Sequence, residues 1–277
     1  MKKIALVLGL AAGLVAIQAS ALPTFQLAGG YQGPVKIKFS NFESFTETVI
    51  VPGAQNFGVV DVTQILDPSN NVLWNKGQDG GFISGVFDGL TVASVSGVAP
   101  NINVHGSGGL IDLYLNPSPI NAAQGISGYA AAGGGCAANQ LCYNTVSNVA
   151  GGGVFLNLAL VSGITTDPTQ TIDATFTADT LPFAGTANAY YDVTGGAFAS
   201  TFHTLGQPSN FGNRDFFAQN TFCTNGQASC NGTGVGDWQL VSDDPIRGSV
   251  PEPGTLALLA AALLGLGFVG ANRRRTL

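Results

Sequence analysis

The stretch Val35-Lys36-Ile37-Lys38-Phe39 decides the fold, because it alternates apolar and charged side chains with a period of two. This is the period of a β-strand with one face buried and the other in water. Similar short runs recur along the chain and are separated by Pro, Gly, Asn and Asp, which favour turns. The further predicted strands are 46–51, 57–66, 72–75, 82–87, 90–98, 110–115, 155–161, 171–177, 187–193, 197–202, 215–222 and 238–241.

Residues 22–249 show no sustained helical periodicity, and the chain is rich in glycine, with 39 residues, and poor in charge. Short strands at intervals of about ten residues predict an all-β antiparallel sandwich or jelly-roll-like domain. This length is enough to bury a core, as one domain or two small ones. Residues 121–153 are rich in Gly and Ala without a clear period, and we expect a long loop excursion at the surface.

The N-terminus has the three parts of a secretory signal peptide, which we place at residues 1–21. Lys2 and Lys3 are the positive region, 4–17 the apolar region, and Ala19-Ser20-Ala21 the small-residue cleavage site. A permanent N-terminal anchor is the alternative. The apolar run is short for that role, so cleavage after Ala21 is the expectation.

The C-terminus holds an uncharged segment, 254–271, followed by Arg273, Arg274 and Arg275. A helix over these 18 residues is about 27 Å long and just crosses a hydrocarbon core of about 30 Å. The arginines predict a cytoplasmic C-terminus and place everything before the helix outside the inner membrane. Val250 and Glu252 each precede a proline, so 250–253 is expected to be extended.

This tail resembles the PEP-CTERM sorting signal of Gram-negative bacteria, in which a Pro-Glu-Pro motif, an apolar helix and terminal arginines follow one another. The resemblance covers residues 250–277 and matches the motif with Val250, Pro251, Glu252 and Pro253. It implies recognition by exosortase, an integral-membrane cysteine protease, and therefore a transient membrane anchor followed by display at the cell surface or release. An ordinary single-pass anchor that is never cut is the alternative.

Four cysteines lie in the exported part, in two local pairs: Cys136 with Cys142 and Cys223 with Cys230. In the oxidising space outside the cytoplasm, such pairs are expected to form disulfides. Four cysteines allow three pairings, and the two local ones are favoured. Zinc fits less well, because neither spacing is typical of a zinc site and no histidine is near in the sequence.

Residues 22–249 contain 15 acidic and 5 basic side chains, a net charge of about −10. This argues against nucleic acid as a partner. It is compatible with cation binding, and the candidate calcium ligands are Asp79, Asp88, Asp243 and Asp244. These aspartates match no known calcium loop, so no metal site is assigned.

The sequence contains no recognisable catalytic motif, and we expect neither catalytic residues nor a cofactor. His105 and His203 are far apart in the chain and are interpreted as structural. Glu43 and Glu47 could form a glycosidase pair, but on one extended strand they would be about 13 Å apart, which is too far. A solvated strand face is the expected role of both glutamates.

The leading hypothesis is a non-enzymatic protein of the cell surface or extracellular matrix, with a role in adhesion, flocculation or association with exopolysaccharide or other surface proteins. This role rests on family analogy alone. A secreted carbohydrate-binding module or hydrolase that uses the same delivery signal is the alternative.

Overall fold

Strand β1 (Gly33–Phe45) shows the predicted alternation, with Val35, Ile37 and Phe39 buried and Lys38 exposed. The computed structural model describes residues 23–124, 151–228, 230 and 232–251. Most of these form antiparallel β-sheet, which confirms the all-β prediction. The predicted signal peptide, the helix at 254–271 and most of the 121–153 excursion lie outside the described residues.

The elements follow one another in a chain dominated by strands. The other strands are β2 (Gln55–Leu66), β3 (Val72–Asn75), β4 (Phe82–Val98), β5 (Asn101–Asn116), β6 (Gly153–Val161), β7 (Ile172–Phe176), β8 (Ala184–Gly195), β9 (Gln207–Ser209), β10 (Gly212–Arg214), β11 (Phe216–Thr224) and β12 (Leu240–Val250). The helical turns are η1 (Ala28–Gly30), η2 (Gln78–Gly80), η3 (Ala122–Gln124) and α1 (Ala199–Phe202).

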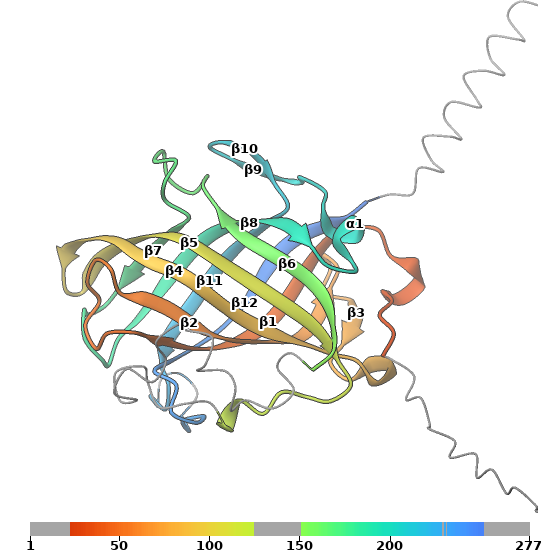
Figure 1. The fold of residues 1–277 in the computed structure, drawn as a ribbon, viewed down its shortest axis with the longest axis horizontal. Coiled ribbons are helices and arrows are strands. Elements are labelled where there is room, and N and C mark those ends of the chain that lie inside the picture. The colour runs from red at the N-terminus through yellow and green to blue at the C-terminus, as the bar shows by residue number, and fades with distance from the viewer. Residues whose placement is uncertain (1–22, 125–150, 229, 231, 252–277) are drawn as a thin grey trace, which may run out of the picture.

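One ten-stranded antiparallel sheet contains nine strands in the order β1-β12-β11-β8-β6-β5-β4-β2-β3, and the tenth, β7, pairs with β5 and β8. The sheet closes on itself because β1 also pairs with β2. The strands wrap around a common interior and the two opposing walls face each other across it (Figure 1). This arrangement is consistent with the predicted sandwich, because two layers of sheet enclose one core. The small hairpin β9–β10 is a separate two-stranded sheet.

Strands β6 and β7 share one position between β5 and β8. Both pair with β5 and with β8 in the same direction, and the chain leaves the sheet between them at 162–171. The β9–β10 hairpin holds this excursion, because Asn210 donates to the Thr165 carbonyl at 3.0 Å and Arg214 to that of Ser162 at 2.9 Å. On β5, residues 107–109 therefore have no ladder partner on this side.

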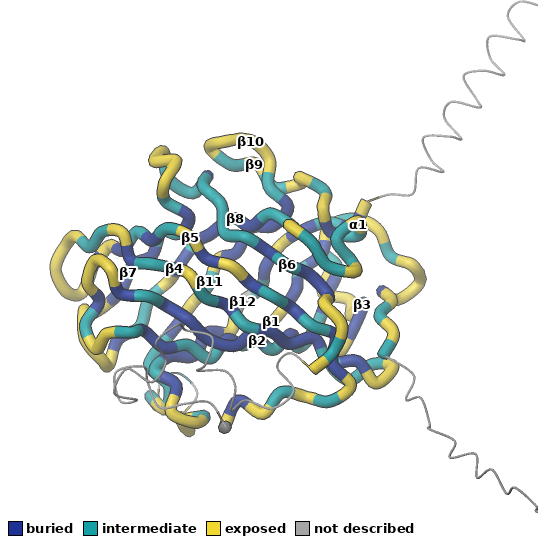
Figure 2. Tube along the Cα trace, viewed as in Figure 1, coloured by how far each residue is buried: buried dark blue, intermediate teal, exposed yellow. Residues whose placement is uncertain are grey.

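Buried residues line the inside of the closed sheet, and exposed residues lie mainly at the loops and strand ends (Figure 2). They form two apolar clusters. The first contains Val35, Ile37 and Phe39 of β1, and the second contains Phe45 of the same strand. Strand β1 therefore runs along the interior from one cluster to the other.

Three sequence predictions for strands need correction. Residues 46–51 form bends with one bridge, between Val49 and Thr180, because β1 ends at Phe45 and its partner β2 begins at Gln55. Within 197–202 the chain forms helix α1, whose Phe202 is fully buried. The runs 82–87 and 90–98 are one strand, β4, which continues through Asp88 and Gly89.

Candidate functional site

The inward face of β1 is interrupted by two polar residues between the apolar clusters. Asn41 and Glu43 have the same parity as the inward residues Phe39 and Phe45, and both line an interior cavity. Asn41 is 8% exposed. Placing polar groups inside costs free energy unless they are hydrogen-bonded, so this interruption identifies a candidate site.

The cavity lies between the two apolar clusters and has a volume of about 90 Å³. Residues from every strand of the closed sheet except β3 line it, so the cavity depends on the complete fold. Its wall is mostly apolar. Glu43, Asn41, Asn56, Asn220 and Tyr191 supply most of the polar groups.

Glu43 is held by hydrogen bonds from neighbouring strands. Asn56 of β2 donates to Oε2 at 3.3 Å and Ser242 of β12 donates to Oε1 at 3.0 Å. Burial raises the pKa of the Glu43 carboxyl, and the bonds from Ser242, Asn56 and Asn41 oppose this rise only in part. Burial, together with the charge of Glu43, also raises the pKa of the Tyr191 hydroxyl well above its usual range.

The expectation of a solvated strand face is wrong for Glu43, and for Glu47 only the exposure is right. Glu43 lies on the inner face of β1, whereas Glu47 follows the end of that strand and is exposed. The parity of the alternation from Val35 onward could have shown this. No sequence pattern indicated the other polar residues of the cavity, because only the closed sheet brings their strands together. These residues are Asn41, Asn56, Asn220 and Tyr191.

Replacing Glu43 with glutamine is expected to change the pH dependence of stability. The folded-state pKa of Glu43 lies above its ordinary value of 4.5, so the folded protein holds this proton more tightly. The stability of the wild type therefore falls as pH rises from about that value to the raised pKa, and then levels off. Glu43→Gln removes this decline and should be the more stable protein at pH 7. Urea unfolding at a series of pH values measures the difference, and parallel curves for the two proteins would contradict it.

A second buried carboxylate, Asp215, is fully buried and organises the chain around helix α1. It accepts hydrogen bonds from the backbone N–H groups of Val193 at 2.8 Å, Thr204 at 2.7 Å and Leu205 at 2.8 Å. His203 Nδ1 lies 2.8 Å from its Oδ2. Burial alone would raise the pKa of Asp215, but the bonds from Leu205, Val193, His203 and Thr204 hold it below its ordinary value.

The two histidines are each next to an aspartate. His105 lies opposite Asp173 on the paired strands β5 and β7, with Nδ1 3.3 Å from Oδ1. His203 has its pKa raised by the hydrogen bond and charge of Asp215. Both contacts tie local structure together, which fits the structural interpretation of these residues.

The aspartates considered for calcium are on different elements: Asp79 in η2, Asp88 on β4, and Asp243 and Asp244 on β12. Across 23–124, 151–228, 230 and 232–251, no three His, Cys, Asp or Glu residues are grouped so that they could hold a metal ion.

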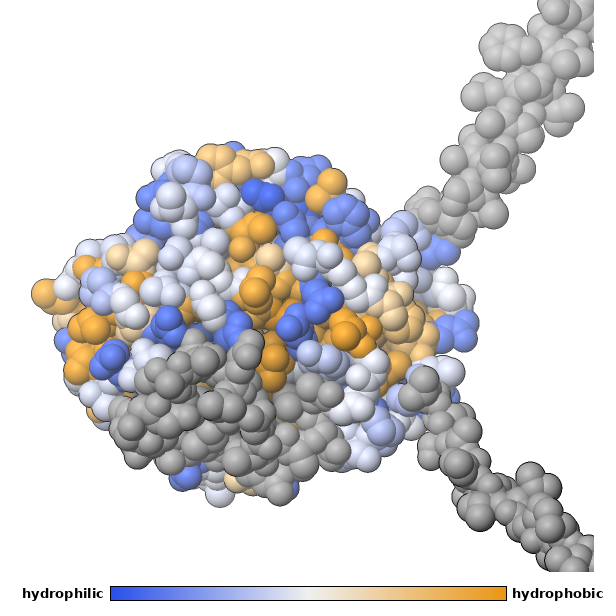
Figure 3. Space-filling view, viewed as in Figure 1, coloured by the Kyte–Doolittle hydropathy of each residue, from blue (hydrophilic) through white to orange (hydrophobic). Residues whose placement is uncertain are grey.

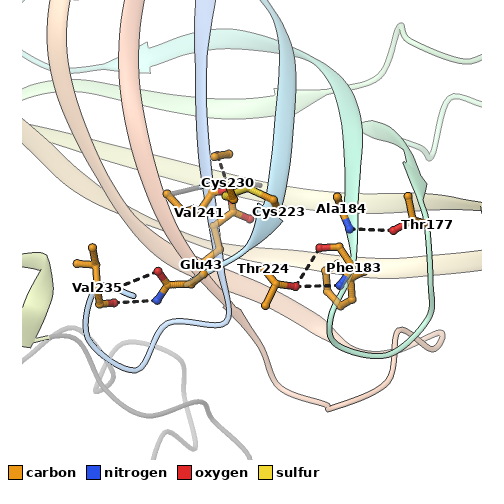
Figure 4. The surroundings of a disulfide bond; sticks show 11 residues. Glu43, Thr177, Phe183, Ala184, Cys223, Thr224, Cys230, Val235 and Val241 are labelled. Carbon is orange, nitrogen blue, oxygen red and sulfur yellow. Dashed lines mark hydrogen bonds between the residues drawn. A yellow bond between two sulfur atoms is a disulfide. The ribbon is translucent and has the colours of Figure 1, made fainter. Parts of the chain in front are cut away.

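The disulfide Cys223–Cys230 is present and confirms one predicted pair. It joins the end of β11 to the following loop, with the two Cα atoms 6.1 Å apart (Figure 4). Next to it, Thr224 Oγ1 accepts from the backbone N–H of Phe183 at 2.8 Å and donates to its carbonyl at 2.9 Å. The other predicted pair, Cys136 and Cys142, lies outside the described residues.

The end of β12 places the start of the tail next to the folded domain. Val250, which the sequence suggested as part of an extended spacer, is 8% exposed, belongs to the first apolar cluster and pairs with Gly33. Pro251 follows it directly and is exposed. The folded domain therefore continues to Val250, the residue directly before Pro-Glu-Pro.

A comparison with family models decides what this tail is. Residues 249–275 match the PEP-CTERM protein-sorting motif. The chain carries a PEP-CTERM sorting signal. This PEP-CTERM motif indicates export, sorting to the cell surface and processing by exosortase. No curated protein and no solved structure matches the chain significantly.

In the part of the chain that the structure describes, no helix combines the length and apolar character needed to cross a membrane. The predicted stop-transfer arginines Arg273, Arg274 and Arg275, and the signal-peptide cleavage residues Ala19 and Ala21, lie outside the described residues. So do Glu252 and Pro253 of the PEP-CTERM motif.

Proposed function

We propose that the protein is a non-enzymatic surface or matrix component, whose β-domain is delivered by the PEP-CTERM signal and then acts in adhesion, flocculation or association with exopolysaccharide. The observation that carries this proposal is the sorting motif at 249–275, which begins as the last strand of the domain ends. The tail anchors the exported precursor transiently in the inner membrane with its C-terminus cytoplasmic. Exosortase then removes the tail.

The interior cavity gives the alternative of a glycan hydrolase or sugar-binding module little support. The interior cavity, at about 90 Å³, is smaller than the roughly 150 Å³ cavity that accommodates benzene, so it does not hold a sugar ring. Its wall holds Glu43 of β1 and Asp88 of β4.

Processing can be tested by replacing Pro251, Glu252 and Pro253 together with alanine in the full chain. The expected result in a Gram-negative host with exosortase is a wild-type protein that lacks both termini and a variant that keeps its tail in the membrane fraction. The motif supplies the extended backbone that a protease binds, and alanine relaxes it. Intact-mass analysis gives the two lengths and also shows whether the four thiols are oxidised.

The matched control is Arg247→Ala, an exposed residue of β12 that lies before the matched segment 249–275 and is expected to leave processing normal. A triple variant that loses its tail as fast as the wild type would contradict the assigned role of the motif. For the surface role, cells that lack the gene are expected to flocculate less and to retain less exopolysaccharide. Unchanged flocculation and retention would count against that role while leaving the sorting result untouched.

A further inference from the structure

The ionisable side chains in the wall of the interior cavity are all acidic. Among the described residues that line it, the ionisable groups are Glu43, Asp88 and Tyr191, and there is no lysine, arginine or histidine. Five aromatic rings also line it, those of Phe45, Phe87, Phe176, Tyr191 and Phe222. Carboxyl groups and ring faces both attract a cation, and neither attracts an anion.

The polar atoms of this wall include hydrogen-bond acceptors without donors. Asn41 is more than nine-tenths buried, and its amide hydrogen-bonds to Glu43, while its Oδ1 has no partner among the described residues. Asn220 Oδ1, on β11 across the same cavity, is also buried without a partner there. Buried acceptors of this kind cost free energy until a donor reaches them.

We propose that this cavity binds a small alkylammonium group, with the ammonium on Glu43, Asn41 and Asn220 and the alkyl part against the aromatic and aliphatic wall. An ammonium carries three N–H donors, which suits three acceptors, and its charge complements the carboxylate. The cavity volume of about 90 Å³ is about three fifths of the roughly 150 Å³ that accommodates benzene, which suits a short unbranched guest.

A neutral alcohol would fill the same volume but fit the wall less well. A hydroxyl has one donor and leaves acceptors unsatisfied, and it does not compensate the charge of Glu43. Burial raises the pKa of Glu43 because the hydrogen bonds from Ser242, Asn56 and Asn41 compensate its charge only in part. Binding of an ammonium should therefore release a proton wherever Glu43 is still protonated.

One part of the cavity wall lies where β6 gives way to β7, beside the residues of β5 without a ladder partner. Here the cavity is lined by Gly106 and Gly109 of β5, by Leu160 and Ile172 on either side of the excursion, and by the exposed Leu110. Glycine lets neighbouring side chains pack closely on β5 here, because a Cβ at Gly106 would lie only 2.6 Å from Ile172 Cγ2. Figure 3 shows apolar residues gathered over the middle of one face of the domain. We place the entry route on this side, because Leu110 both lines the cavity and is exposed at the surface.

The test is a calorimetric titration of the exported protein with n-butylammonium chloride, n-butanol and sodium butyrate. The expected result is saturable binding of butylammonium, at least tenfold weaker binding of butanol, and no binding of butyrate. In Glu43→Gln, the affinity for butylammonium should fall at least tenfold, about 1.4 kcal/mol, and its preference over butanol should disappear. Thermal unfolding of the same samples shows that the variant is folded.

Two further variants make the result specific to the cavity. Glu47→Gln changes an exposed glutamate outside it and is expected to bind like the wild type. Ala187→Leu, at a buried position in the wall, should fill the space and abolish binding of both butylammonium and butanol. The proposal is overturned if butylammonium does not saturate, if butanol binds as tightly, or if Glu43→Gln keeps the wild-type affinity. None of these readouts depends on tail processing.

Discussion

Replacing Asp215 with alanine is expected to destabilise the domain by roughly 3–5 kcal/mol. The substitution removes the acceptor of three backbone N–H groups and of His203, and the pocket that forms is closed to water, because Asp215 is fully buried. Each buried donor left unsatisfied costs about 1–3 kcal/mol. The loss should appear in urea unfolding as a lower midpoint. Its structural cause would be a weaker attachment of helix α1 to β8.

Asp215→Asn and Asp237→Ala are the matched variants for this prediction. Asparagine keeps one acceptor oxygen, that of its amide, so Asp215→Asn should lose less stability than Asp215→Ala. Asp237 is exposed, and its replacement should change stability by less than about 0.5 kcal/mol. Because the pKa of Asp215 is lowered on folding, its stabilisation is present at neutral pH and is lost as pH falls through the folded pKa. A cost below about 1 kcal/mol for Asp215→Ala would refute the role given to this carboxylate.

The second large effect is expected at Trp74, which is fully buried in the first apolar cluster and contacts Phe25, with ring centroids 6.1 Å apart. Trp74→Ala should cost about 3–5 kcal/mol, because the cavity that it leaves lies between fixed strands. Trp74→Phe should cost much less. The indole N–H is buried without a hydrogen-bond partner among the described residues, so phenylalanine removes a polar group that contributes nothing there.

Val72→Ala on the same strand is the control, since Val72 is 43% exposed and its loss should be small. Denaturant unfolding of the three variants gives the comparison. Equal losses for Trp74→Ala and Trp74→Phe would mean that the indole nitrogen, rather than the bulk of the ring, is what stabilises this position.

The sequence was sufficient to predict the features that depend on neighbouring residues. Strand β3 and most of β2 followed from alternation and turn residues, Cys223–Cys230 from spacing, and the sorting signal from a linear motif. Alternation fails where no partner strand is available. Residues 46–51 and 197–202 have side chains typical of strands, but they form no strand of the sheet.

The cavity could not be predicted, because it depends on register between distant strands. Asn41, Asn56, Tyr191 and Asn220 belong to β1, β2, β8 and β11, and only the closing pair β1–β2 and the order of the other strands bring them to one place. No sequence pattern indicated the role of Asp215 either, since most of its partners are backbone groups 10–22 residues earlier in the chain. Such contacts leave no pattern of residue types.

The position of β12 also decides how the domain responds to mechanical load. Antiparallel ladder bonds are perpendicular to their strands, so a pull on Pro251 along β12 shears many of them at once instead of peeling them off singly. These bonds join β12 to β1 from Gly33 to Glu43 on one side and to β11 on the other. A domain held by its C-terminal end in flowing water therefore bears tension through a strand that is bonded on both sides.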